Sequence, residues 1–162
     1  MARFKLKQGF ESKLILGLHS LEHRVYKMHR FPLVKCVLSF VFSVLNHAII
    51  QGIFNCVIPK EVNHGKNLCI PHPFNIVFSP CLVIGDNIKI MHGVTIGINE
   101  LSSDTVEGIK IGNDVYIGCN ASIIGNSLRI GNNVTIGANA AVITNVPDGA
   151  TAVGVPARII KK

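Results

Sequence analysis

The chain has 162 residues, enough for one domain with a core of useful size. Its net charge is +7, and the whole excess lies in residues 1–60, which hold nine Lys and Arg against two Asp and Glu. The sequence has no zinc-finger spacing, helix-turn-helix cue or aromatic-basic strand motif, so we expect no nucleic-acid partner. The basic segment is expected to be a solvated helix face, with contact to anionic lipid as the alternative.

The cysteines indicate the redox environment. The chain has five, an odd number, and none forms a CxxC pair. This pattern predicts reduced thiols in a cytoplasmic protein and argues against a disulfide framework.

Residues 1–56 are predicted to form a short N-terminal helical segment. Leucines recur at helical spacing before Pro32, and the stretch 33–58 is strongly apolar. Lys35 and several polar residues interrupt it, and its longest apolar run, residues 37–45, is far shorter than the roughly 20 residues that span a bilayer. We expect a helix buried against the rest of the fold or a neighbouring subunit; peripheral membrane contact is the alternative.

The second half of the chain repeats every six residues. An aliphatic residue recurs at this interval, often followed by Gly, as at Ile96, Ile111, Ile117, Ile123, Ile130, Ile136 and Val142. A period of six fits neither a helix nor a two-sided strand, but it is typical of a parallel β-helix in which three hexapeptides form one triangular coil. The repeat breaks at a polar loop after Ile96 and at a seven-residue step between Ile123 and Ile130. The segment after Val142 is expected to cover the last coil.

Two of the seven histidines lie at informative positions. His72 and His92 are twenty residues apart, close to the eighteen of one coil, so they should face the same side on neighbouring coils. They would then share a cleft, or each would cap a corner through a backbone hydrogen bond. His19 and His23 lie four apart in a basic helical stretch, but nothing completes a metal site, and a solvated face is expected there.

Three segments carry a family resemblance: residues 70–97 (IPHPFNIVFSPCLVIGDNIKIMHGVTIG), 111–126 and 130–160, the last ending in GVPARII. They cover about two thirds of the chain. The chain resembles the hexapeptide-repeat acyltransferases, and most of all the serine acetyltransferase branch with its relatives that O-acetylate bacterial polysaccharides. The resemblance implies a mainly β fold, a left-handed parallel β-helix over residues 57–162 with a C-terminal cap, assembled as a homotrimer.

The resemblance also implies acetyl-CoA as donor and direct transfer to a hydroxyl. His72 matches the catalytic histidine, the general base that takes the proton of the acceptor hydroxyl; His92 is expected to assist. In the family, CoA lies in a groove between subunits. The matching wall positions are Ile98, Cys119 and Ala138, with Pro156 and Arg158 near the nucleotide end. No metal is expected.

Departures from the serine enzymes point to another acceptor. Val57 and Pro71 replace two aspartates near the catalytic histidine, and the loop stretch 105–109 lacks the arginine and second histidine that handle the amino acid. The loop offers Glu100, Asp104 and Glu107 but no cation. A free amino acid needs partners for both of its charges. A sugar hydroxyl of a surface polysaccharide or its precursor is therefore the expected acceptor, and serine is the alternative.

Two other classes of protein fit the sequence less well. An enzyme similar to the γ-type carbonic anhydrases needs three converging histidines, and only His72 and His92 are well placed, with His64 a poor third. A non-catalytic assembly module would need neither the HGVTIG nor the GVPAR segment.

Overall fold

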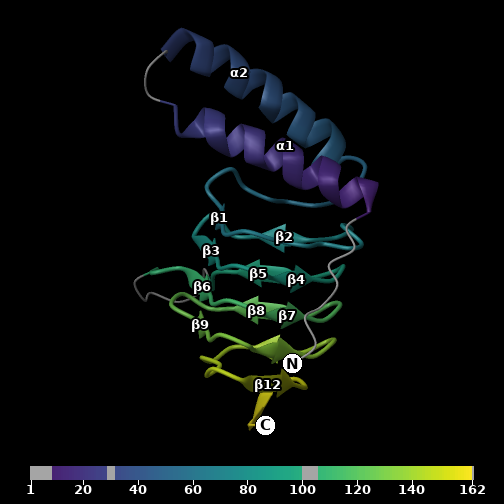
Figure 1. Cartoon of the computed structure of the whole chain (residues 1–162), viewed down its shortest axis with the longest axis vertical. Coiled ribbons are helices and arrows are strands. Elements are labelled where there is room, and N and C mark those ends of the chain that lie inside the picture. Colours follow the sequence, from purple (N-terminus) through teal and green to yellow (C-terminus); the bar gives the residue numbers. More distant parts are fainter. Residues whose placement is uncertain (1–8, 29–31, 100–105, 162) are drawn as a thin grey trace.

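The structure is a computed structural model that describes residues 9–28, 32–99 and 106–161. Two helices lie above a stack of short strands (Figure 1). Helix α1 spans Phe10–Tyr26 and α2 spans Pro32–Leu45, and the π-helix η1 continues α2 over Asn46–Gln51. The helices thus fall within the segment for which the sequence predicts them.

The described strands are two to four residues long. They are β1 Asn63–His64, β2 Val77–Phe78, β3 Leu82–Ile84, β4 Lys89–Ile90, β5 Thr95–Gly97, β6 Ile109–Ile111, β7 Tyr116–Ile117, β8 Ser122–Ile124, β9 Arg129–Ile130, β10 Thr135–Ile136, β11 Ala141–Val142, β12 Ala150–Val153 and β13 Arg158–Lys161.

The strands form three parallel sheets that the chain visits in rotation. One sheet holds β1, β3, β6 and β9; the second holds β4, β7, β10 and β12, with β13 added antiparallel at its end; the third holds β2, β5, β8 and β11. From β3 to β11, each set of three successive strands is therefore one turn of a coil that stacks on the next, which confirms the prediction from the six-residue period. Val77 pairs with Thr95, eighteen residues on, whereas Tyr116 pairs with Thr135, nineteen on, because the seven-residue step adds one residue.

The recurring aliphatic residues fill the centre of the coil. Ile96, Ile117, Ile123 and Ile136 are completely buried, and they belong to one continuous hydrophobic cluster. At the chain end, β13 pairs antiparallel with β12 and extends the second sheet by one strand. The core of the coil is thus completed within one chain.

Asparagines, rather than the glycines of the repeat, carry the left-handed corners. Seven Asn and one Asp among the described residues have φ between 50° and 60°: Asn55, Asn67, Asn75, Asn87, Asp114, Asn120, Asn133 and Asn139. Asn tolerates this conformation better than other residues with a side chain. The side chains also bond along the stack, since Asn67 Nδ2 donates to Asn87 Oδ1 at 2.8 Å and Asn87 Nδ2 to Asp114 Oδ1 at 3.1 Å.

Helix α2 corrects one of the two expectations for the apolar segment: within the chain it is not buried against the coils, so burial against a neighbouring subunit stays a prediction. Helix α1 lies between α2 and the coils (Figure 1) and buries Ile15 and Val25 on its inner side. None of the α2 residues is buried. The span Pro32–Gln51 has 20 residues; its most apolar window of 18 residues has a mean hydropathy of 1.9, and only 6% of that window is buried. By length and composition it could cross a membrane, unlike the shorter run considered from the sequence.

Candidate active site

His72 and His92 lie together at one edge of the coil stack. His72 occupies the turn before β2, and His92 occupies the corresponding turn before β5, one coil further on. Their ring centroids are 6.4 Å apart, with the ring planes at 74°. Both side chains are exposed in the single chain, so both imidazoles can reach a bound molecule.

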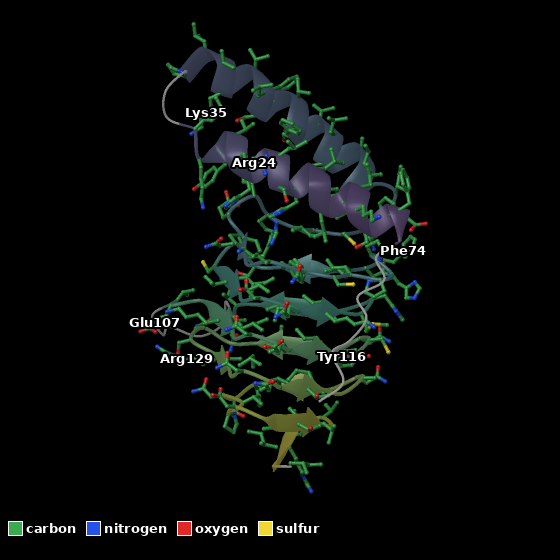
Figure 2. All side chains as sticks on the ribbon, viewed as in Figure 1. Arg24, Lys35, Phe74, Glu107, Tyr116 and Arg129 are labelled. Atoms are coloured by element: carbon green, nitrogen blue, oxygen red, sulfur yellow. The ribbon has the colours of Figure 1, made fainter. Side chains whose placement is uncertain are left out.

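His92 belongs to a column of side chains at equivalent positions of successive coils. The column, called here the His92 column, consists of Phe74, His92, Cys119 and Ala138. Backbone hydrogen bonds of 2.9 Å link its coils: Gly93 N–H donates to the Phe74 carbonyl, Asn120 N–H to that of His92, and Asn139 N–H to that of Cys119. Figure 2 shows Phe74 at the edge of the stack that lies next to the start of α1.

Cys119 and Ala138, two of the positions assigned to the CoA wall, therefore share an edge with His92. Pro156 lies close to this edge as well, because the neighbouring Ala157 N–H donates to the Ala141 carbonyl at 2.8 Å. Arg158 is exposed at the start of β13. Ile98 is different: it follows β5 and is separated from His92 by the length of that strand.

A cavity of about 390 Å³ adjoins His72. Its lining combines the turn around His72 with the start of α1, and consists of Gly9, Glu11, Pro71, His72, Pro73 and Phe74. A Cβ added at Gly9 would lie 2.7 Å from Glu11 Oε2 and 4.0 Å from the Pro71 carbonyl oxygen. The absence of a side chain at residue 9 thus lets the Glu11 carboxylate approach the turn that carries His72.

Sequence reasoning missed Glu11. It lies in the first turn of a helix, where an acidic residue has an ordinary explanation in the helix dipole. Some sixty residues separate it from His72, and no local pattern connects them. Only the packing of α1 on the first coil brings the carboxylate and the imidazole to one cavity.

The acidic loop residues are placed only in part. Glu100 and Asp104 lie outside the described residues. Glu107 is exposed, and Figure 2 shows it at the edge of the stack opposite Phe74, on the side of Arg129. Within one chain, Glu107 therefore does not face the cavity beside His72.

The expectation of a solvated face at His19 is wrong. His19 is 1% exposed, and its Nε2 is 3.0 Å from the Pro59 carbonyl oxygen, whereas its buried Nδ1 has no partner among the described groups. Desolvation by burial, reinforced by the neighbouring His64 and His23, lowers the pKa of His19 from 6.5 to about 4. The hydrogen bond to Pro59 and the nearby Glu61 oppose this shift. His19 thus joins α1 to the first coil as a neutral imidazole.

His64, the third histidine considered for a metal site, belongs to this second group. Its ring centroid is 5.5 Å from that of His19. In the described part of the chain, no group of three or more His, Cys, Asp and Glu side chains is arranged to hold a metal ion.

Comparison with known proteins identifies relatives along most of the chain. No family model matches it. Serine acetyltransferase 1, chloroplastic, of Arabidopsis thaliana is 36% identical over 153 residues, which are 94% of this chain and 45% of that protein. The putative colanic acid biosynthesis acetyltransferase WcaB of Escherichia coli strain K12 is 38% identical over 116 residues, 72% of this chain and 70% of that protein.

Solved structures of serine acetyltransferases are also similar to this chain. The Neisseria gonorrhoeae serine acetyltransferase in complex with serine has a TM-score of 0.77 at 33% identity, covering 93% of this chain and 57% of that one. The serine acetyltransferase of Brucella abortus strain S19 in complex with coenzyme A has a TM-score of 0.77 at 30% identity, covering 94% and 56%.

The coil of hexapeptides and the relatives along it define the class: the chain belongs to the hexapeptide-repeat acyltransferases. Within this class its relatives are the serine acetyltransferases and WcaB. The chain spans a little under half the length of the plant serine acetyltransferase, but more than two thirds of WcaB.

Proposed function

We propose that this protein is an acetyl-CoA-dependent O-acetyltransferase whose general base is His72. The observation that carries the proposal is the edge along which His72, His92, Cys119 and Ala138 lie on successive coils, with an open cavity beside His72. The proposal extends to the division of the chain into a helical segment, residues 1–56, and a catalytic domain, residues 57–162. The five free cysteines support a reducing, cytoplasmic location.

The proposed chemistry is a direct transfer. The His72 imidazole takes the proton of the acceptor hydroxyl as the oxygen attacks the thioester carbonyl of acetyl-CoA. The bond from carbonyl carbon to sulfur then breaks, and the imidazolium returns the proton to the leaving thiolate. An imidazole suits both steps near neutral pH, and no acetylated enzyme group is required.

We propose that the coil is left-handed and that three chains assemble into a homotrimer. The arrangement within one chain supports the assembly, because the exposed His72 edge and Glu107 lie on opposite edges of the stack (Figure 2). A neighbouring chain placed against the His72 edge would turn that open edge into a groove. The acetyl donor would lie in this groove along Cys119 and Ala138, with Pro156 and Arg158 near the nucleotide, while Ile98 lines its far end.

The proposed acceptor is a sugar hydroxyl of a surface polysaccharide or its precursor. Glu11 lines the cavity next to His72, and carboxylates accept hydrogen bonds from hydroxyl groups. The described lining of this cavity offers no cation that would bind the carboxylate of an amino acid. We propose that Glu11 holds the acceptor while His72 activates it, and that His92 assists. The name of WcaB, which assigns that relative to colanic acid biosynthesis, agrees with a saccharide.

Serine is the second candidate acceptor. The Arabidopsis relative and the two solved structures described above are serine acetyltransferases, and one of these structures holds serine. The Glu11 carboxylate could also receive the ammonium group of serine. The carboxylate of serine would then need a cation from a neighbouring chain.

The decisive experiment measures CoA release by the purified chain with acetyl-CoA and a panel of acceptors. Serine, free sugars and nucleotide sugars are compared, and mass spectrometry identifies the acetylated product. Transfer to a saccharide but not to serine is the expected result. Efficient transfer to serine alone would establish the second candidate, and no transfer to any hydroxyl together with an intact fold would contradict the proposed activity.

A further inference from the structure

We propose that helix α2 docks this protein onto an anionic membrane surface, lying flat with its outer face among the lipids. The outer face of α2 is defined here by its exposed apolar residues, Leu33, Cys36, Val37, Phe40, Val41 and Val44. Leu33 and Phe40 are 82% and 71% exposed. The six residues of the outer face form a continuous apolar stripe along the helix, since they recur at spacings of three and four.

The exposed apolar stripe of α2 is unusual for a surface helix, because the side that faces the rest of the molecule is the mixed one and also carries Lys35 and Ser39. Phe42 and Leu45 are half-buried toward the rest of the molecule. A surface helix normally turns its apolar stripe toward the core and its polar residues toward water. Because α2 has no buried residue in the chain, its outer face requires another apolar phase.

Charge favours lipid over a second copy of the chain. Residues 1–60 carry the entire net charge of +7. No charged side chain interrupts the outer face, because Lys35, the one charged residue of α2, places its Nζ 5.8 Å from the centre of the Tyr26 ring on the α1 side. An anionic bilayer would be attracted to this segment, whereas a symmetric pairing of two copies would bring two positive segments together.

The geometry favours a helix that lies on the membrane rather than across it. With η1, α2 is 20 residues long, or about 30 Å. Helix α1 packs along it and carries charged residues, including Glu11 and Arg24. A spanning helix would carry this charged neighbour into the hydrocarbon. A helix at the membrane interface keeps α1 and the coils on the aqueous side, as the layering in Figure 1 allows.

Vesicle co-sedimentation of the full chain tests this proposal. The protein should sediment with vesicles of phosphatidylcholine and phosphatidylglycerol, and roughly tenfold less with phosphatidylcholine alone or at high salt. Phe40→Glu should weaken binding at least tenfold, because it places a charge in the apolar stripe. The matched control Val83→Glu changes an exposed valine of the coil, 43% exposed, and should bind as the unmodified protein does.

Two cysteines of the protein report whether the outer face of α2 becomes covered by lipid. Cys36 lies on the outer face of α2 and Cys81 lies on the coil, and both are exposed. Addition of anionic vesicles should protect Cys36 from a membrane-impermeant maleimide while Cys81 remains reactive. Absence of vesicle binding, binding that Phe40→Glu does not change, or protection of Cys36 without vesicles would overturn the proposal. Protection of Cys36 without vesicles, together with dissociation of an oligomer by Phe40→Glu, would identify the outer face of α2 as a subunit interface. None of these measurements depends on acetyl transfer.

Discussion

The coil and the helical segment differ in how completely their apolar residues are buried within one chain. In the coil, each turn covers the next, so isoleucines such as Ile96 and Ile117 are completely buried within one chain. In the helical segment, α1 covers the first coil but leaves α2 with an exposed apolar face. The charge differs as well, since residues 61–162 hold equal numbers of basic and acidic residues and residues 1–60 hold the whole excess.

Because of this difference, the coil provides stability, whereas the helical segment is available for interaction. A part of the molecule whose apolar surface is already covered supplies a rigid frame, and its exposed edges are free to carry chemistry. A part whose apolar surface is open depends on something outside the chain. The candidate active site lies where the two parts meet, with His72 from the coil and Glu11 from α1.

The largest expected effect is the loss of acetyl transfer in His72→Ala. Removal of the general base should lower kcat by a factor on the order of 10²–10⁴. The thermal midpoint should hardly change, because His72 is exposed. CoA release and thermal unfolding are measured together, with His47→Ala, another exposed histidine, as the control. Loss of folding in His72→Ala would show instead that this residue is a structural corner.

Two substitutions that shorten a side chain to alanine test the difference in burial directly. Ile117→Ala, in the centre of the coil, should lower the free energy of unfolding by about 2–5 kcal/mol because it leaves a cavity. Val37→Ala, on the outer face of α2, should change it by less than about 0.5 kcal/mol in the absence of lipid. Urea unfolding measures both variants. Equal losses at the two positions would mean that the α2 face is already covered in solution.

Acid should weaken the junction between α1 and the coil through His19. The folded protein holds this imidazole neutral with a pKa of about 4, whereas the unfolded chain protonates it near 6.5. The unfolded state therefore binds more protons between these values, and stability should fall as the pH drops from 6.5 to 4. The full loss is on the order of 3 kcal/mol.

Urea unfolding at several pH values, followed by the helical circular dichroism signal, measures this loss. His19→Gln retains a side-chain donor but no titrating group, so its stability should vary less across the same window. His47→Gln, at an exposed position, should retain the pH dependence of the unmodified protein. An unchanged pH dependence in His19→Gln would assign the effect to His23, His64 or Glu61, the titratable groups around it.

The smallest effect is expected at Glu11. Glu11→Gln should raise the KM for the acceptor roughly tenfold, the usual cost of losing a hydrogen bond to a charged group, with little change in the KM for acetyl-CoA. Lys13→Gln, in the same part of α1 but lining a different hollow with His64 and Asn67, is the matched control. Steady-state kinetics with varied acceptor separate the two constants. An equal change in both KM values would place Glu11 outside the acceptor site.

The sequence by itself determined the coil. A period of six is a local property, so the buried isoleucines and the seven-residue step near Ser127 could be read from residue order alone. It also predicted that His72 and His92 share one side, because one coil has nearly constant length.

Tertiary structure decided what lies between the two parts of the molecule. The burial of His19, the exposure of α2 and the position of Glu11 beside His72 all depend on how α1 packs across the first coil. The repeat spacing fixes contacts between neighbouring coils, but no spacing in the sequence relates a helix to a coil some sixty residues away. That contact is set by the shape and polarity of the two surfaces, and these exist only once both parts have folded.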